Sequence, residues 1–522
     1  MDSKPDKVIV TNVAALKEKY GAQGYALIEK RIEALITADK QRGLVTALIP
    51  LDDKTAMKAL AASAVTRASD PAQNKQPIDG VYKALAPDYV VILGAIDVVP
   101  HQDLTNPVHD PSGEDNDKCA YGDLPYACEA PYGKNAKDFV GPTRVVGRIP
   151  DVTGSSDPAY LAGVLKVAAE YQHALPPSLK SYFAVTAQIW NKSTDLSVGN
   201  TFGAPATVQQ VPPSDYKWTQ AQLQGHMHFF NCHGAPRSPQ FYGQPTGGAN
   251  VYPPALDAAY IDGKLQEGTI VAAECCYGGE LYALSATQKQ IGICNVYLAN
   301  KAYGFFGSTT IAYGPETGNG QADLICQYFL QNILHGSSLG RAALEARQTF
   351  VRKSSPTDPS DLKTLAQFNL YGDPSITPIQ TPRPFVIAEA AANAVAERSE
   401  RKDRRRLLFR EGLNLAAKEP VPERSARKPK KAIVDRLHAS ARAEGRTPGA
   451  LLSFTIKHRV SAKLPRTLGR ASSLPSAFYV LFTKSEKDAR SARRETGVVD
   501  IVAFVGKEVG DELVSVAKIR SR

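Results

Sequence analysis

A chain of 522 residues exceeds what one hydrophobic core usually supports, so we expect two or three domains. No uninterrupted apolar stretch reaches the roughly 18 residues that span a bilayer, and the first residues, MDSKPDKVIVTN, lack the apolar core of a signal peptide. The seven cysteines are an odd, thinly spread number, unlike the pattern of a disulfide-stapled secreted fold. We therefore expect a cytoplasmic protein with free thiols and no transmembrane segment.

The charge is divided unevenly along the chain, whose formal net charge is +10. From Arg383 onward there are 31 Lys and Arg against 16 Asp and Glu, which leaves 31 against 36 before it. The C-terminal part thus carries about +15 and the rest about −5. Such a basic tail could attract an acidic partner, an acidic membrane surface or nucleic acid without specificity, although charge runs are more often solvated helix faces.

Short β-rich runs alternate with longer segments of helical periodicity up to about Pro382. This alternation predicts an α/β fold, with a mostly parallel sheet covered by helices on both faces. The expected strands are Val8–Asn12, Leu44–Pro50, Tyr89–Leu93, Arg144–Arg148, Phe183–Ala187, Met227–Asn231, Thr269–Ala273 and Gly304–Thr309. The expected helices are Val13–Asp39, Asp157–His173, Gln321–His335 and Ser338–Val351.

Breaks in this pattern suggest the domain organisation. Eight strands are many for one sheet, and Pro176 and Pro177 interrupt the chain near its first third, so we divide the α/β part into residues 1–175 and 176–382. Residues 383–448 are predicted to form a basic connector with helical tendency, which contains the runs RKDRRR and RKPKK. Residues 449–522, with runs such as FYVLFTK, are expected to form a small α+β C-terminal module.

Two segments of the second α/β subdomain share one design. MHFFNCH ends at His233 and is followed by Gly234, and TIVAAECC ends at Cys276 and is followed by Tyr277 and two glycines. Each is an apolar strand that delivers a reactive side chain at its carboxyl end, the edge of an open α/β sheet where ligands bind. If the two strands are parallel neighbours, His233 and Cys276 face each other across one crevice.

These residue types suit nucleophilic catalysis. A thiol of ordinary pKa is only a few per cent thiolate at neutral pH, and an imidazole has the right pKa to move its proton. Acyl transfer also needs donors for the developing oxyanion, and the backbone N–H groups of Gly234 and Cys276 lie at the right strand ends. Gly234 also lets a substrate carbonyl approach closely, because it has no Cβ.

The sequence at these two strands, NCHG and AAECCYGG, resembles the cysteine peptidases of the caspase, legumain, clostripain and gingipain group. Gingipains are the most similar of these, since YVVILGAIDVVP, RVVGRIPD, GFFGSTTIAYG and FNLYGDPS also look like that family and occur in matching order. The likeness extends over roughly Tyr89 to Pro378. It implies a caspase-like catalytic subdomain at 176–382 that hydrolyses peptide bonds, preceded by a related α/β subdomain.

The adjacent cysteines raise the question of which one attacks. Matching the family's Cys-x-x-Gly pattern and its Glu-Ala-Cys pattern both select Cys276. Alternation along a strand then turns Cys275 to the opposite face, where it is expected to pack as a small apolar residue.

Substrate preference follows from the resemblance. Gingipains that cleave after Arg hold the guanidinium with an Asp in the loop after the strand that opens the catalytic subdomain, and here that loop reads WNKSTDLSVG. Asp195 is its single acid and is the expected substrate-binding residue, with Asp215 as another candidate. The expected substrate is a protein or peptide with Arg or Lys before the scissile bond.

Three other interpretations remain open. A zinc site built from His233, Cys275 and Cys276 is unfavourable, because adjacent strand cysteines point to opposite faces and lack the usual spacing. Cleavage after Arg or Lys would make RKDRRR and RKPKK sites of self-cleavage in the connector. A noncatalytic scaffold whose basic tail binds an acidic partner or nucleic acid is the rival function. For the peptidase reaction itself, we expect neither a metal nor an organic cofactor.

Overall fold

The computed structural model describes residues 4–110, 114–174, 178–247, 249–287, 289–354, 357–379, 390–426, 428–457, 476–484 and 487–522. The proposed boundaries at 175–176 and 382–383, with their prolines, lie outside these ranges, as does Arg427 of the run RKPKK. Those boundaries stay predictions. No helix among the described residues is long and apolar enough to cross a membrane.

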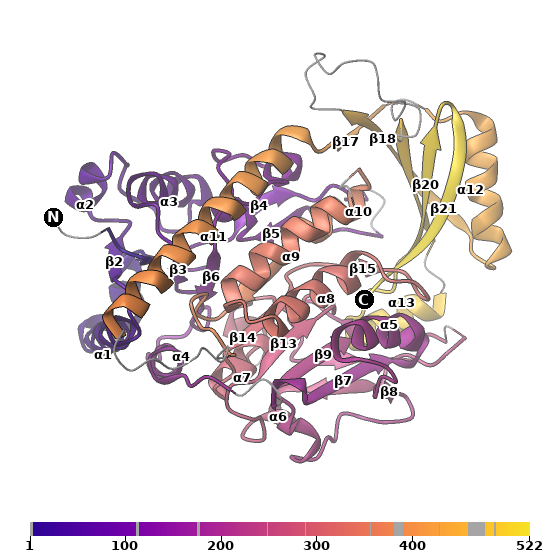
Figure 1. Cartoon of the computed structure of the whole chain (residues 1–522). Helices are drawn as coiled ribbons and strands as arrows, with labels where there is room; N and C mark the ends of the chain where they lie inside the picture. Colours follow the sequence, from indigo (N-terminus) through magenta and orange to yellow (C-terminus); the bar gives the residue numbers. More distant parts are fainter. Residues whose placement is uncertain are drawn as a thin grey trace.

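A ten-stranded sheet forms the centre of the molecule (Figure 1). Its strands, in spatial order, are β2 (Thr46–Pro50), β1 (Lys7–Thr11), β3 (Tyr89–Leu93), β6 (Val146–Ile149), β16 (Phe368–Tyr371), β14 (Gly304–Ser308), β13 (Ile270–Ala273), β9 (Met227–Asn231), β7 (Tyr182–Ala187) and β8 (Gln209–Val211). All eight strands expected from the sequence are present, and the α/β fold class is confirmed.

The sheet consists of two parallel halves that run in opposite directions. Every neighbouring pair is parallel except β14 with β16, where Phe306 faces Leu370 in antiparallel register. The two expected α/β subdomains therefore share one continuous sheet. Strand β16 comes from the second subdomain but joins the first half by pairing with β6.

Helices cover both faces of this sheet. The described helices are α1 (Val13–Gln41), α2 (Lys54–Ala59), α3 (Pro71–Leu85), α4 (Ala159–Glu170), α5 (Asn191–Phe202), α6 (Ala258–Ile261), α7 (Ile293–Ala299), α8 (Gln321–Leu334), α9 (Leu339–Ser354), α10 (Pro359–Gln367), α11 (Ala390–Lys418), α12 (Lys431–Ala443) and α13 (Lys487–Thr496). Successive strand residues point to opposite faces. Phe305 of β14 contacts Tyr297 of α7, and Phe306 contacts Phe329 of α8, so α7 and α8 lie on opposite sides.

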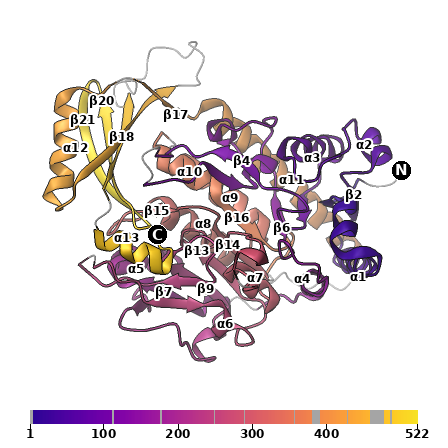
Figure 2. The ribbon, with the colours of Figure 1, turned by 180° about the vertical axis from the view of Figure 1, so that it is seen from behind.

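A second, six-stranded antiparallel sheet is built mainly by the C-terminal part of the chain (Figure 2). Its order is β15 (Tyr313–Gly314), β21 (Glu512–Ser521), β20 (Val502–Val509), β19 (Ala477–Thr483), β18 (Pro448–Lys457) and β17 (Val421–Arg424). Strand β17 and α12 come from the expected connector range. Strand β15 belongs to the second α/β subdomain, so β21 runs directly into that subdomain. Two smaller sheets combine β4 (Gln102–Thr105) with β5 (Cys119–Gly122), and β10 (His233–Gly234) with β11 (Gln240–Tyr242) and β12 (Pro254–Asp257).

The basic connector forms helix α11, which crosses the body diagonally in Figure 1. Its arginines pair with acids of the preceding part of the chain. Arg398 Nε lies 3.0 Å from Asp6 Oδ1, and Arg404 Nε lies 2.9 Å from Glu345 Oε1. Part of the positive tail is thus neutralised within the molecule. Cleavage inside RKDRRR would require α11 to unwind first.

Arg148 of β6 is fully buried next to β16, where the first half of the large sheet ends. Its Nε and Nη2 donate to the carboxylate oxygens of Asp123 at 2.9 and 2.6 Å, and its Nη1 donates to the carbonyl oxygens of Gly94 and Val99. Its backbone pairs with Tyr371 of β16. Removing the guanidinium would leave the Asp123 charge buried without its partner, which is strongly destabilising.

We predict that Arg148→Leu lowers the free energy of unfolding by about 3–5 kcal/mol, measured by urea denaturation followed by circular dichroism. Lys301→Ala is the control, because it removes an exposed ion pair with Glu267 and should cost less than about 1 kcal/mol. Equal stability of the two variants would contradict this role for Arg148.

Candidate active site

Parallel pairing of β9 with β13 brings the two motif segments together. Ala273 pairs with Phe230, and the Glu274 N–H donates to the Phe230 carbonyl oxygen at 2.8 Å just beyond the last paired residues. Both strands are buried and apolar, as expected for central strands of a parallel sheet. His233 and Cys276 therefore emerge at the same edge of the sheet, and both are completely buried.

Gly234 lies directly against the Cys276 backbone. A Cβ at position 234 would lie 1.7 Å from the Cys276 carbonyl oxygen, a distance that no side chain tolerates. Glycine is therefore required here for close approach of two backbones. This approach aligns the N–H groups of Gly234 and Cys276 on one point.

That point is occupied by the main-chain oxygen of Arg522, the last residue of the sequence. The oxygen accepts from the Cys276 N–H at 3.0 Å and from the Gly234 N–H at 3.3 Å. The Arg522 N–H donates to the Ala312 carbonyl oxygen at 3.0 Å. Two backbone donors converging on one carbonyl-type oxygen form the arrangement that stabilises an oxyanion in acyl transfer.

The side chain of Arg522 fills a closed pocket beside these donors. Its Nη2 lies 2.9 and 3.1 Å from the two carboxylate oxygens of Asp323 and donates to the Pro315 carbonyl oxygen at 2.7 Å. The guanidinium carbon lies 4.5 Å from the centre of the Trp190 ring, a cation–π contact. A buried carboxylate, a carbonyl and an aromatic face together define a binding site for an arginine side chain.

Two further residues shape this pocket. A Cβ on Gly314 would lie 2.3 Å from Nη2 of Arg522, so glycine leaves the space that the guanidinium takes. Glu274, fully buried nearby, has its pKa raised by burial and by the neighbouring Asp323 carboxylate. Burial and the nearby carboxylate therefore both favour the protonated form of Glu274.

The imidazole of His233 is oriented by Gln244. Its Nε2 lies 2.8 Å from Oε1 of Gln244, an atom that can only accept, so Nε2 carries the hydrogen. The amide of Gln244 is fixed in turn, because its Nε2 donates to Ala249 and Asp500 at 3.1 and 3.3 Å. His233 Nδ1 is buried and makes no hydrogen bond within the described residues. Its lone pair is therefore open to accept a proton.

The two adjacent cysteines have different surroundings. The Cys276 Sγ accepts from the Ala312 N–H at 3.3 Å, next to Arg522. Burial raises the pKa of its thiol, and the Ala312 backbone offsets only part of that rise. Cys275 is also buried, and burial together with neighbouring Cys232 raises its thiol pKa. Its Sγ lies 3.9 Å from the Phe230 carbonyl oxygen, a packing position away from the Arg522 main chain.

The two acids expected to bind substrate lie elsewhere. Asp195 is exposed on α5, whereas Ser193 of the same helix faces inward, 3.5 Å from Nη2 of Arg522. Asp215 is exposed and pairs with Lys217. The acid that contacts Arg522 is Asp323, in the first turn of α8, which the sequence marked only as a helix start. Gln244, Trp190 and Gly314 were also not singled out from the sequence.

No group of three or more His, Cys, Asp and Glu side chains in the described parts of the chain could hold a metal ion. The interpretation of His233, Cys275 and Cys276 as zinc ligands therefore gains no support from their placement. The described cysteines are free thiols.

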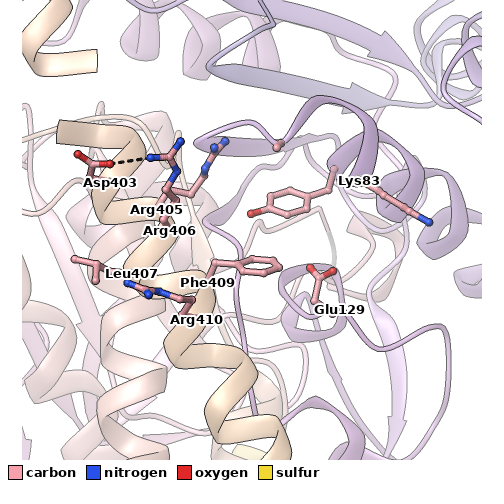
Figure 3. A pocket seen from close by; sticks show the side chains of 10 residues that line it. Lys83, Glu129, Asp403, Arg405, Arg406, Leu407, Phe409 and Arg410 are labelled. Carbon is pink, nitrogen blue, oxygen red and sulfur yellow. Dashed lines mark hydrogen bonds and ion pairs between the residues drawn. The ribbon is translucent and has the colours of Figure 1, made fainter. Parts of the chain in front are cut away.

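Two of the cavities lined by described residues lie outside the arginine pocket. One, of about 510 Å³, borders the C-terminal strand at Lys518 and Arg520 and is also lined by Glu316. The other, of about 820 Å³, lies between α3 and α11 (Figure 3). Its labelled lining residues are Lys83, Glu129, Asp403, Arg405, Arg406, Leu407, Phe409 and Arg410. One of its arginines, Arg406, pairs with Asp403 within α11.

Comparison with known proteins gives likenesses of fold alone. No protein-family model matches the sequence, and no curated protein matches it. Among solved structures, the Arg-specific cysteine proteinase gingipain R is similar at 11% identity and a TM-score of 0.47, over 99% of this chain and 98% of that one. A complex of gingipain pro- and mature domains from Porphyromonas gingivalis matches at 11% identity and 0.47, over 98% and 99%. A structure described only as a protease matches at 12% identity and 0.47, over 100% and 98%.

We predict that His233 is neutral down to about pH 5, because burial lowers its pKa to about 4. An unfolded histidine has a pKa of about 6.5, so the folded state binds fewer protons and loses stability as the pH falls from 6.5 toward 4. The measurement is an NMR titration of ¹⁵N-histidine-labelled protein, with His233→Gln to assign the signal. A His233 pKa near 6.5 would contradict the burial described here.

Proposed function

We propose that this protein is a cysteine endopeptidase that cleaves after arginine. Cys276 is the nucleophile, His233 transfers the proton, and the N–H groups of Gly234 and Cys276 bind the oxyanion. Asp323 recognises the guanidinium, in place of Asp195. A protein or peptide is the substrate, and the reaction requires no metal or organic cofactor.

The position of Arg522 is the observation that carries this proposal. Its main-chain oxygen accepts from both proposed oxyanion donors, while its side chain ends on Asp323. Main chain and side chain are thus bound as those of the residue before a scissile bond would be. A scaffold has no need for a nucleophile, a base, two converging amide donors and a charged pocket at one point, so the rival function is not favoured.

The chemistry follows from these contacts. The Cys276 thiol loses its proton to Nδ1 of His233, and the sulfur attacks the carbonyl carbon of the substrate arginine. The carbonyl oxygen takes the negative charge and is stabilised by the two N–H groups. His233 gives its proton to the leaving amine, and a thioester remains on Cys276. Water, deprotonated by His233, then hydrolyses the thioester and restores the thiol.

Arginine fits the pocket better than lysine. The guanidinium is planar and stacks on an aromatic face, as that of Arg522 does on Trp190. A lysine ammonium is a compact point charge that cannot stack in this way.

We predict that Cys276→Ala, made in a chain that also carries Arg522→Ala so that the pocket is free for substrate, lowers kcat on an arginine peptide by about 10⁴-fold or more, because it removes the attacking sulfur. Cys275→Ala is the matched control, since its sulfur packs on the other side of the strand, and it should retain most of the activity. Hydrolysis of a fluorogenic arginine substrate in reducing buffer measures both. Activity that survives in Cys276→Ala and disappears in Cys275→Ala would assign the nucleophile to Cys275.

We predict that Asp323→Asn, made in a chain that also carries Arg522→Ala so that the pocket is free for substrate, lowers kcat/KM for arginine substrates by about 100-fold, as expected when a buried guanidinium loses its carboxylate. Asp195→Asn, which changes an exposed acid, should have little effect. Comparing arginine, lysine and norleucine substrates separates the loss of charge recognition from a general loss of activity. A specific effect of Asp195→Asn would return recognition to that residue.

A further inference from the structure

The C-terminal strand is bound along the active-site cleft by main-chain pairing. In antiparallel register, Tyr313 of β15 pairs with Ser521 of β21, and Gly314 pairs with Arg520. Pairing continues past the strand end, where the Arg522 N–H donates to Ala312. Addition of an extended segment to an exposed strand edge is a common mode of peptide recognition, in which alternate side chains enter specific sites.

Alternate side chains of this strand do enter charged sites. Arg520, two residues before Arg522, donates from Nε to Asp500 at 2.6 Å and from Nη1 to Glu316 at 3.3 Å. Lys518, two residues earlier, lies 2.9 Å from Glu316 Oε2. The side chains of 518, 520 and 522 therefore face one side, as the twofold period of a strand requires. Glu316 belongs to the second α/β subdomain, so this subdomain contacts the strand at more than its last residue.

The same C-terminal module also covers the histidine strand. Val498 packs with Ala235, Tyr242 and Tyr252 in one apolar cluster. Asp500 accepts from the Tyr252 hydroxyl at 2.9 Å and from the Gln244 amide that orients His233. With these contacts in place, His233 and Cys276 have no solvent-accessible surface.

We propose that strand β21 is an intramolecular ligand of the cleft, held by Arg522, and keeps the peptidase latent until the strand leaves. This inference rests on the proposed function. A substrate must displace the strand, because both require the Asp323 pocket and the two amide donors. A tethered ligand also acts at a high effective concentration, on the order of millimolar, so it excludes ordinary substrate concentrations.

The test compares the wild-type chain with Arg522→Ala in two assays. Alkylation of Cys276 by iodoacetamide, located by peptide mapping, reports access to the thiol. Hydrolysis of a fluorogenic arginine peptide reports activity. We expect Arg522→Ala to raise both rates about tenfold or more, since it removes the buried charge pair that anchors the strand. Arg494→Ala is the control, because it removes an exposed arginine of the same module.

The two assays distinguish a failure of the latency proposal from a failure of the proposed function. Faster alkylation of Cys276 without hydrolysis by either chain would support occupation of the cleft and overturn the proposed function. Full hydrolysis by the wild type, unchanged in Arg522→Ala, would overturn latency and leave the peptidase proposal standing. Glu316→Gln is a second variant, since it weakens the contacts of Arg520 and Lys518 while Asp323 stays intact. Intermediate rates are expected for it, and wild-type rates in both variants would overturn the inference.

A peptide added in trans tests whether the strand itself is the ligand. Lys-Ile-Arg-Ser-Arg, the sequence of residues 518–522, should inhibit Arg522→Ala competitively. Lys-Ile-Arg-Ser-Ala should inhibit at least about tenfold more weakly. Wild-type latency should not change over about a hundredfold range of protein concentration, because the ligand is tethered. Latency that disappears on dilution would show that a second copy supplies the strand, and would overturn the intramolecular form.

Discussion

The parallel pairing of β9 with β13 is the constraint on which the site depends. Because the two strands run side by side and end together, His233 and Cys276 reach the same edge of the sheet. Glycine at position 234 then lets the two backbones approach so closely that their N–H groups converge on one oxygen. Moving either strand by one residue would turn its reactive side chain to the opposite face.

Charge complementarity within the chain explains its uneven distribution. The acidic body and the basic C-terminal part neutralise each other at several places, from the α11 pairs to the contact of Arg522 with Asp323. Buried ion pairs are weak contributors to stability, because desolvation offsets much of their attraction. They are strongly specific, however, since either partner left alone is costly. In this protein the buried pair of Arg522 with Asp323 fixes the position of the C-terminal strand.

Local patterns in the sequence were sufficient for much of the fold. The eight expected strands and four expected helices exist because apolar runs and helical periodicity are local properties. The reversal of direction between β14 and β16 could not be predicted, because it depends on the pairing of Phe368–Tyr371 with a strand far away in the sequence. The edges of the C-terminal module could not be predicted for the same reason, since its sheet includes β15 from the second α/β subdomain.

The candidate site likewise contains residues that the sequence predicted and a residue that it did not. His233, Gly234 and Cys276 were apparent because each stands at the end of an apolar strand. Asp323 was not, because its role depends on contact with Arg522, about 200 residues further along the chain. Its position in the first turn of α8 resembles an ordinary helix-capping acid, and it also accepts from the Gly320 N–H at 3.3 Å.

The proposed reaction is attack of Cys276 on the carbonyl carbon of an arginine bound by Asp323. The most direct measurement treats the Arg522→Ala chain with a peptidyl-arginine acyloxymethyl ketone and locates the adduct by mass spectrometry. We expect a single adduct on Cys276, formed much faster than with the norleucine analogue of the reagent. An adduct on another cysteine, or equal rates for the two reagents, would contradict it.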